Sequence, residues 1–207
     1  MKKVVLLTSS GIESACLMYF YLSRGYVLYP AYVRCGLPWE RVEVIWLKRL
    51  WFYYRKRFGR ILPPRIIPLK SFVRLRSVAR EEDIEIPLRN MTLLLATTLY
   101  AHQKRVKAVA IGSLGMYPFP DNSKEYMERM EGLISEGLRE NVSVDVPFMG
   151  RDKGEIVREF SGRVPFNLTF SCASPVGIHH CGTCAKCRER KEGFSRAGVR
   201  DPTLYLS

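Results

Sequence analysis

Short apolar runs alternate with longer amphipathic segments along most of the chain. The apolar runs predict buried β-strands over residues 2–8, 26–36, 65–69 and 107–113. The longer segments predict helices over residues 13–25, 39–58, 89–106, 123–137 and 152–160. Because parallel strands need crossover connections, this alternation predicts an α/β fold with a mainly parallel sheet and helices on both of its faces.

Two of the predicted helices have a clear apolar face. In the helix over 39–58, the spacing places on one side Val42, Ile45, Trp46, Leu50 and Tyr53. In the helix over 123–137, it places on one side Tyr126, Met130, Leu133 and Ile134.

Three segments directly follow predicted strands and carry polar or glycine-containing sequences: residues 8–14, 34–39 and 112–122. The carboxyl ends of parallel strands meet at one edge of a sheet, and ligands of such sheets bind there. We therefore expect these segments to gather around a ligand site.

The segment TSSGIES, residues 8–14, joins a predicted strand to a predicted helix. Small residues let backbone N–H groups approach an oxyanion, and the start of the helix adds its positive end. Glu13 supplies a carboxylate where Mg²⁺ could bridge to a phosphate. The segment is neither a G-x-x-x-x-G-K-S/T loop nor a G-x-G-x-x-G loop. By itself it is equally consistent with Ser9 or Ser10 capping the helix.

The composition narrows the class of protein. A chain of 207 residues can form one compact domain with a sizeable core and a small appendage. We expect a cytoplasmic protein without a membrane span, because no stretch of about 20 uncharged apolar residues is present and the start MKKVVLLTSSG does not resemble a signal peptide. The net charge of +13 suits polyanions such as ATP or RNA, but the basic residues are scattered, which favours a solvated surface.

Four of the six cysteines lie close together near the C-terminus, at Cys172, Cys181, Cys184 and Cys187. In a cytoplasmic chain this spacing favours a metal over disulfides. Four thiolates form a closed tetrahedral zinc site, which is structural because no coordination position stays open. Iron–sulfur ligation is less consistent with the spacing, since no further cysteine followed by proline lies downstream.

The remaining histidines and cysteines, which could also bind a metal, leave alternatives open. His179 or His180 could replace Cys172 as the fourth ligand, or could lie over the mouth of the active site. Cys16 is expected in the core, and Cys35 lies on a loop at the end of a strand.

Residues 9–14 resemble the SGGxDS loop of the ATP pyrophosphatase family, with Ser10 in place of a glycine and Glu13 in place of an aspartate. Further matching segments are IPLRNMTLLLA, FPDNSKEYM, DKGEIV and FSCASPVGIHHCGTCAKCRER. In this order they resemble the 7-cyano-7-deazaguanine synthase family over nearly the whole chain. The resemblance implies a Rossmann-like adenine-nucleotide α-hydrolase (HUP) fold. It also implies a PP-loop ATP-binding domain over 1–165 and a C-terminal zinc-binding segment over 166–207, packed on the same domain.

The resemblance also implies a reaction and a site. Members of this family use ATP to activate the carboxylate of 7-carboxy-7-deazaguanine, which ammonia converts to an amide and then a nitrile, for queuosine or archaeosine in tRNA. The implied catalytic residues are Glu13, Arg89 and Lys153. The implied nucleotide site comprises Thr8, Ser9, Ser10, Gly11, Ile12, Glu13, Ser14, Asn90 and Asp121. The implied cofactors are ATP, Mg²⁺ and Zn²⁺, the last bound by the four clustered cysteines, and the implied assembly is a homodimer.

Two loops depart from the family pattern near the substrate. The segment GSLGMYPFPDNSKEY lacks the family's acidic pair, and YVRCGLPWE lacks its Y-G-Q-R. The chain therefore looks like a divergent branch that acts on this carboxylate or a related one. One alternative is an enzyme that adenylates a tRNA base for thiolation or lysidine-type chemistry, with Cys35 as a nucleophile, although tRNA contact is not favoured. The other is a catalytically degenerate homologue that binds nucleotide weakly.

Overall fold

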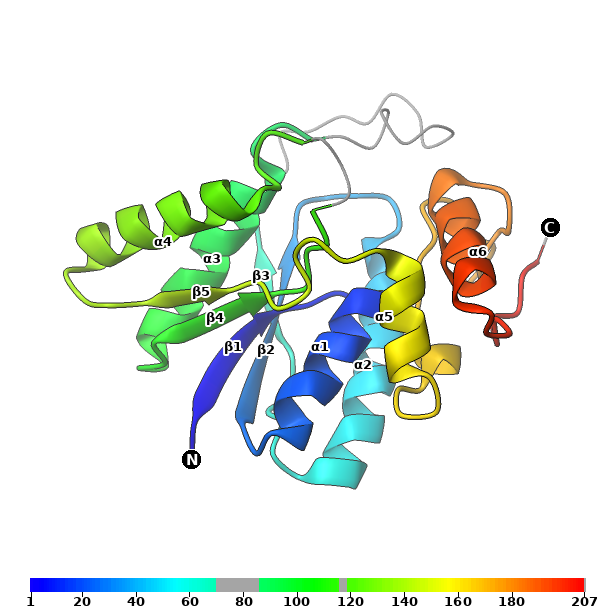
Figure 1. Cartoon of the computed structure of the whole chain (residues 1–207), viewed down its shortest axis with the longest axis horizontal. Helices are drawn as coiled ribbons and strands as arrows, with labels where there is room; N and C mark the ends of the chain where they lie inside the picture. Colours follow the sequence, from blue (N-terminus) through cyan, green and yellow to red (C-terminus); the bar gives the residue numbers. More distant parts are fainter. Residues whose placement is uncertain (70–85, 116–118, 207) are drawn as a thin grey trace.

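The computed structural model describes residues 1–69, 86–115 and 119–206 and contains one five-stranded sheet (Figure 1). All of its strand pairs are parallel, in the spatial order β3-β2-β1-β4-β5. The strands are β1 (Lys3–Leu7), β2 (Val27–Arg34), β3 (Arg65–Pro68), β4 (Ala108–Ile111) and β5 (Ser143–Asp145). The predicted α/β class is therefore confirmed. Of the predicted ligand segments, 112–122 is described except for residues 116–118.

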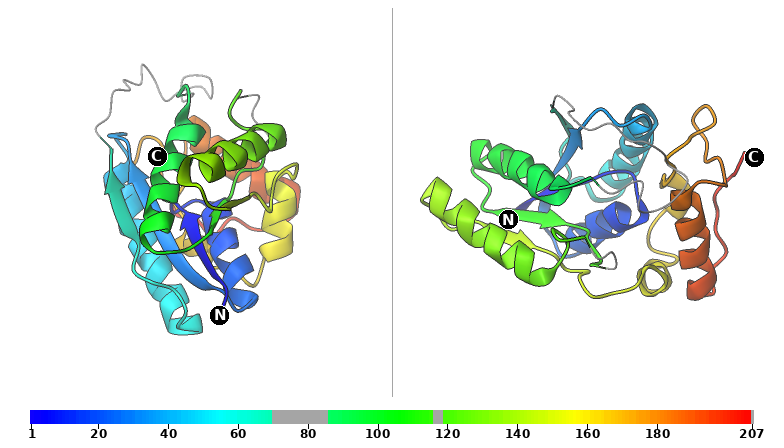
Figure 2. Two further views of the ribbon diagram at one scale, coloured as in Figure 1. Left: turned by 90° about the vertical axis from the view of Figure 1, so that its left-hand side faces the viewer. Right: turned by 90° about the horizontal axis from the view of Figure 1, so that it is seen from above.

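Helices cover both faces of this sheet, as Figures 1 and 2 show. They are α1 (Ile12–Ser23), α2 (Glu40–Phe58), α3 (Arg89–Gln103), α4 (Lys124–Leu138), α5 (Lys153–Phe160) and α6 (Ala185–Ala197), with a 3₁₀ turn η2 (Phe166–Leu168). One core cluster joins the sheet to α1, α2 and α5, and a second joins it to α3 and α4. Helix α6 packs on α5 instead of the sheet. Among the described residues, no helix combines the length and apolarity needed to cross a bilayer.

The order of the strands makes the chain connections diverge at the carboxyl ends of β1 and β4, which are neighbours in the sheet. Leu7 pairs with Ala31 of β2 on one side and with Ile111 of β4 on the other. The chain leaves β1 toward β2 and α1, whereas it leaves β4 toward α4, so the two connections diverge above neighbouring strands. This point of divergence is where open parallel sheets bind ligands.

The buried faces of two helices differ from the predicted ones. In α2 the buried apolar residues are Val42, Leu47, Leu50 and Tyr54, while Ile45, Trp46 and Tyr53 are only half-buried. Trp46 instead donates its indole N–H to the carbonyl of Ile178 at 2.7 Å, because this side of α2 packs on the cysteine segment. In α4, Leu133 is 61% exposed and Met127 is buried in its place.

Two elements were absent from the sequence prediction. Strand β5 has only three residues and forms the edge of the sheet, so its apolar pattern is too short to distinguish from a loop. Helix α6 lies within the cysteine segment and begins directly after Cys184. Most of its residues are polar, which hides the helical period.

A fully buried arginine organises the region beyond α5. Arg190 of α6 donates hydrogen bonds to Thr169 Oγ1 at 2.7 Å, to the carbonyl of Phe166 at 3.1 Å and to Asp201 Oδ1 at 3.3 Å. Burial opposes the ionisation of Asp201, but the guanidinium outweighs it and lowers the pKa of Asp201 below its usual value. The ion pair between Arg190 and Asp201 connects the segment that follows α6 to that helix.

We expect Asp201→Asn to destabilise the fold, because it leaves the buried guanidinium of Arg190 without its counter-charge. The free energy of unfolding should fall by roughly 3 kcal/mol, measured by urea denaturation. The control is Glu192→Gln, which removes the carboxylate of an exposed ion pair with Arg196 and should cost less than about 0.5 kcal/mol. Equal costs for the two variants would contradict this account.

Candidate functional site

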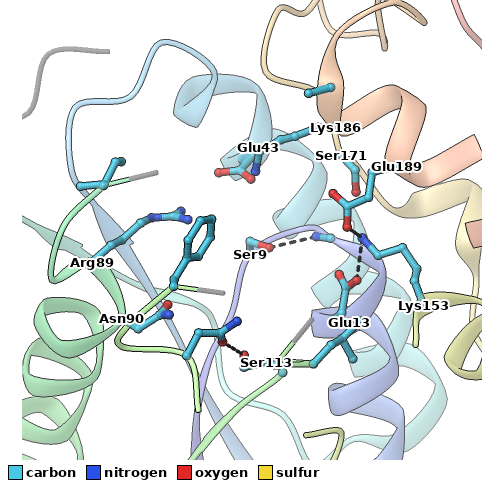
Figure 3. Close-up of a pocket in the computed structure, with 18 of the residues that line it drawn as sticks. Ser9, Glu13, Glu43, Arg89, Asn90, Ser113, Lys153, Ser171, Lys186 and Glu189 are labelled. Carbon is cyan, nitrogen blue, oxygen red and sulfur yellow. Dashed lines mark hydrogen bonds and ion pairs between the residues drawn. The ribbon is translucent and has the colours of Figure 1, made fainter. Parts of the chain in front are cut away.

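A cavity of about 260 Å³ lies above the carboxyl ends of the strands (Figure 3). The loops after β1 and β4 form its floor, and residues of α2, α3, α5 and α6 form its walls. Its charged lining residues are Glu13, Glu43, Arg89, Asp121, Lys153, Lys186 and Glu189. Of the three predicted ligand segments, 8–14 and the described part of 112–122 line the cavity, whereas 34–39 does not. Residues 34–39 instead fold onto Glu40, whose carboxylate accepts hydrogen bonds from the N–H groups of Cys35 and Gly36.

The loop after β1 presents the start of α1 to the cavity. Gly11 is the N-cap of α1, with no side-chain cap, so the N–H groups of the first turn lack a side-chain acceptor. The hydroxyl of Ser9 accepts the N–H of Gly11 at 3.0 Å, and the hydroxyl of Ser14 accepts the N–H of Ser9 at 2.9 Å. These bonds hold the loop in a shape suited to bind an anion.

Ser10, which occupies a glycine position of the PP-loop pattern, does not need glycine's conformational freedom. Among the described non-glycine residues, positive φ angles occur at Leu88, Arg105 and Arg139 and not at Ser10. The carbonyl of Ser10 accepts the N–H of Phe170 at 2.7 Å, which links the loop to the cysteine segment. Its buried hydroxyl forms no hydrogen bond with the described residues. The serine is therefore compatible with the loop backbone.

Lys153 connects three elements at one end of the cavity. It is the first residue of α5, and its ammonium lies 2.9 Å from Glu13 Oε1 of α1 and also contacts the carboxylate of Glu189 of α6 (Figure 3). Burial opposes the charge of Lys153, but the two carboxylates outweigh it and raise its pKa. Burial likewise opposes ionisation of Glu13, yet Lys153 lowers its pKa. Both Lys153 and Glu13 are therefore charged at neutral pH.

Two glycines make room for this cluster. A Cβ at Gly193 of α6 would lie 2.6 Å from Cγ of Lys153, so only glycine leaves a path for the lysine between α5 and α6. A Cβ at Gly112 would lie 3.2 Å from Cβ of Glu13, where the end of β4 meets the first turn of α1. Close approach of backbones positions both charged side chains.

The start of α3 is held by the loop after β4. Asp121 accepts the N–H of Asn90 at 2.8 Å, and the side-chain amide of Asn90 donates to Asp121 Oδ1 at 3.2 Å. Leu88, the residue directly before α3, has a positive φ of 59°, a conformation that is strained for a leucine. The chain therefore turns sharply just before Arg89, whose side chain lines the cavity.

The four clustered cysteines converge on one point beside the cavity. Their sulfur atoms all lie within 4.8 Å of one another, with separations of 3.6 Å between Cys172 and Cys181, 3.9 Å between Cys184 and Cys172, and 4.0 Å between Cys181 and Cys187. Four sulfurs on one zinc ion at ~2.3 Å would be about 3.8 Å apart. The residues therefore fit a single tetrahedral metal ion. An iron–sulfur cluster would hold its cysteines on different irons and so farther apart.

Hydrogen bonds and ring contacts orient the cysteines. The N–H groups of Ala173, Cys181 and Cys184 each lie 3.4 Å from a cysteine sulfur. His180 is not arranged as a ligand, because its Nε2 accepts the N–H of Ser171 at 2.9 Å and its ring packs on Phe170. The structure thus groups Cys172, and neither histidine, with the other three cysteines.

The predicted site residues divide into two groups. Those that line the cavity are Ser9, Gly11, Glu13, Arg89, Asn90, Asp121 and Lys153. Those that do not are Thr8, Ser10, Ile12 and Ser14. The hydroxyl of Thr8 donates to the carbonyl of Ala31 at 3.3 Å, and Ile12 is fully buried in the core.

Three charged lining residues were missed by sequence reasoning: Glu43, Lys186 and Glu189. Lys186 and Glu189 are three residues apart on α6, a spacing that would have placed them on one face had the helix been predicted. Glu43 was missed because it lies among the buried core residues of α2, where the sequence pattern indicates a helix face that packs in the core.

Comparisons with known proteins agree with this arrangement. The model of the family described as queuosine biosynthesis protein QueC matches residues 75–198. The 7-cyano-7-deazaguanine synthase of Methanoculleus marisnigri is 30% identical, covering 99% of both chains, and that of Methanothermobacter thermautotrophicus is 31% identical over 82% of this chain and 76% of its own. A solved 4-thiouridine synthetase–RNA complex with bound ATP has a TM-score of 0.56 at 18% identity, covering 95% of this chain and 50% of that one. That likeness concerns the fold alone, which is α/β as predicted.

We expect Ser10→Gly to change the affinity for Mg·ATP by less than about threefold, because the backbone at this position has no positive φ. Gly11→Ala should weaken binding clearly, since its Cβ would lie 3.3 Å from Ser9 Oγ and 3.4 Å from Glu13 Oε2, where a phosphate would bind. Calorimetry measures both. A tenfold gain for Ser10→Gly would show that the serine obstructs the loop.

We expect the purified protein to contain one tightly bound metal ion per chain, measured by elemental analysis. Cys184→Ser should lower this content and the melting temperature, because it removes one of four converging sulfurs. Cys35→Ser is the matched control, since this half-buried thiol lies outside the cluster. Full metal content in the Cys184→Ser variant would contradict the assignment.

Proposed function

Because the chain belongs to the QueC family of queuosine biosynthesis proteins, we propose that it is an ATP-dependent carbon–nitrogen ligase that converts 7-carboxy-7-deazaguanine and ammonia into 7-cyano-7-deazaguanine. A closely related carboxylate is the alternative substrate. The observation that carries the proposal is the Glu13–Lys153–Glu189 cluster beside an uncapped helix start, at the divergence point of a parallel sheet. This is a place where a polyphosphate can be bound and its charge balanced.

The loop after β1 binds the phosphates in this proposal. The first-turn N–H groups of α1 receive phosphate oxygens, and the bonds among Ser9, Gly11 and Ser14 hold the loop ready for them. Glu13 would hold Mg²⁺, which would screen phosphate charge. Hydroxyls that lie away from the cavity, such as that of Thr8, support the loop instead of touching the ligand.

Lys153 stabilises the charge that grows on the leaving phosphate groups. Its raised pKa keeps it cationic throughout the neutral range, so it acts as a fixed positive charge and not as a base. Glu189 keeps the ammonium directed into the cavity from α6. Arg89 of α3 is the cation on the opposite side of the cavity.

The chemistry itself requires positioning more than a protein nucleophile. In the overall reaction the carboxylate loses both oxygens, one when ammonia displaces the activated oxygen and one when the amide is dehydrated. Among the described residues, the cavity is lined by neither cysteine nor histidine. Holding activated acid and ammonia together in a closed site accounts for the rate acceleration.

Cys35 does not favour the thiolation alternative. Burial raises the pKa of its thiol, Arg89 lowers it and Glu40 raises it, with a net increase that disfavours the reactive thiolate. It also lies outside the described lining of the cavity.

The proposal includes the remaining parts of the molecule. Residues 1–165 would form the ATP-binding domain, and residues 166–207 a zinc-binding segment packed on it, with zinc holding the start of α6 against the loop that carries Cys172. The zinc is structural, because all four sulfurs are directed at one point and no position is left open. Free ammonium supplies the nitrogen, and two copies form a dimer.

We expect the purified protein, incubated with ATP, Mg²⁺, ammonium and 7-carboxy-7-deazaguanine, to form the nitrile detected by mass spectrometry. Lys153→Met should lower kcat at least about 100-fold, because a single preorganised charge contributes that much to stabilising a transition state. Lys124→Met is the control, since this lysine is largely exposed on α4.

Two outcomes would overturn the proposal. ATP consumption independent of the acid would remove the substrate assignment. Failure to bind Mg·ATP at millimolar concentration would identify a catalytically degenerate homologue.

A further inference from the structure

The two ends of the cavity differ in how their charges are matched. At one end, Lys153 is paired with Glu13 and Glu189. The other end carries Glu43, Arg89 and Lys186, and none of these three forms an ion pair with another residue that the structure describes. In Figure 3, Arg89 and Lys153 enter the cavity from opposite sides. A ligand that complements the unmatched end must bring both hydrogen-bond donors and negative charge.

Glu43 is a buried carboxylate held by one hydrogen bond. It is 9% exposed, and its Oε2 accepts the hydroxyl of Tyr32 at 2.6 Å. Burial, together with the carboxylate, raises the pKa of Tyr32, so the phenol stays protonated and fixes the orientation of Glu43. No hydrogen bond from the described residues reaches Oε1. A buried carboxylate is costly without further donors, which a ligand in the cavity can provide.

Arg89 and Lys186 supply cations at the same end. Nε of Arg89 is buried and forms no hydrogen bond with the described residues. The ammonium of Lys186 lies 5.3 Å from the centre of the Trp39 ring; it is attracted by the charge of Glu43 but forms no direct ion pair in the described part of the chain. Two unpaired cations next to one carboxylate favour a ligand with an anionic group and a separate donor edge.

The acceptor acid of the proposed reaction has this pattern, whereas adenine does not. A guanine-like ring presents two adjacent donors, its ring N1–H and its 2-amino group, which one carboxylate can accept together. The corresponding edge of adenine places an acceptor nitrogen beside its amino group, and a carboxylate would repel it. On a 7-carboxy-7-deazaguanine ring, the carboxylate lies next to the 6-carbonyl, so both face cations. Ile86 and Phe170 offer apolar contact to the ring.

We propose that Glu43 binds the N1–H and 2-amino donors of the acceptor base, while Arg89 and Lys186 bind its carboxylate and 6-carbonyl. This inference rests on the proposed function, because it concerns the acceptor of that reaction. Glu43 is a specificity residue, and Tyr32 is a positioning residue that acts through it.

The test compares 7-carboxy-7-deazaguanine with the analogue that lacks the 2-amino group. The wild-type protein should prefer the complete acid by roughly 10- to 100-fold in kcat/KM, the usual effect of a hydrogen bond to a charged group. In Glu43→Gln this preference should fall to within about threefold, since an amide oxygen accepts only part of the pattern. The KM for the acid should rise, and the KM for ATP should not change.

Tyrosine variants separate positioning from general destabilisation. Tyr32→Phe removes the hydroxyl that holds Glu43 and should lower the preference part of the way. Tyr21→Phe is the matched control, because it removes another buried hydroxyl that donates to a carboxylate, Asp145 at 3.1 Å, away from the cavity. It should keep the full preference.

Three outcomes overturn the inference: an undiminished preference in Glu43→Gln, a higher Mg²⁺ requirement in that variant, which would assign Glu43 to the metal, or no preference in the wild-type protein. If the wild-type protein converts neither acid, the proposed function fails separately. Calorimetric binding of the two acids then decides the inference, and equal affinities reject it.

Discussion

The ammonium of Lys153 is the charge around which the site is arranged. A lysine buried this deeply must be compensated, and the two carboxylates that do so come from the first turn of α1 and from the middle of α6. Because the lysine begins α5, one cluster fixes three helices relative to one another. Any shift of α6 would move Glu189 away and leave the ammonium of Lys153 with the carboxylate of Glu13 alone.

The cysteine segment is therefore connected to the loop after β1 at two points. Cys184 is the N-cap of α6, so the position of the four sulfurs determines where Glu189 lies. Phe170, two residues before Cys172, donates its N–H to the carbonyl of Ser10. A metal ion in the cluster would thus hold the phosphate loop in place without touching a reacting atom. In the proposed function, this coupling would explain why a structural metal ion lies beside the nucleotide site.

In the proposed function the cavity divides into a polyphosphate end and an end suited to a base. At the first end, the ammonium of Lys153 pairs with two carboxylates of the chain; at the second, Glu43, Arg89 and Lys186 form no ion pair with another described residue. The structure gives a physical account of two departures from the family pattern, Ser10 and the loop over 34–39. Ser10 has no positive φ, so its backbone conformation is open to residues other than glycine. The loop over 34–39 folds on Glu40, and Glu43, which we propose to recognise the base, lies one turn further along α2.

Much of this protein follows from its sequence. Periodicity predicted the parallel α/β sheet, because buried strands and amphipathic helices leave local patterns, and the cysteine spacing predicted the four-sulfur cluster, because metal ligands sit at short, regular intervals. The structure places much of the predicted PP-loop at the cavity, although the roles of its residues stay predictions. What only the tertiary structure decided are contacts between distant segments. The carboxylate of Glu189 pairs with the ammonium of Lys153, which lies 36 positions away in the sequence. The carboxylate of Glu43 accepts a hydrogen bond from the hydroxyl of Tyr32 in β2. No local pattern encodes such pairings, since they arise when the sheet and the metal segment bring separate helices together.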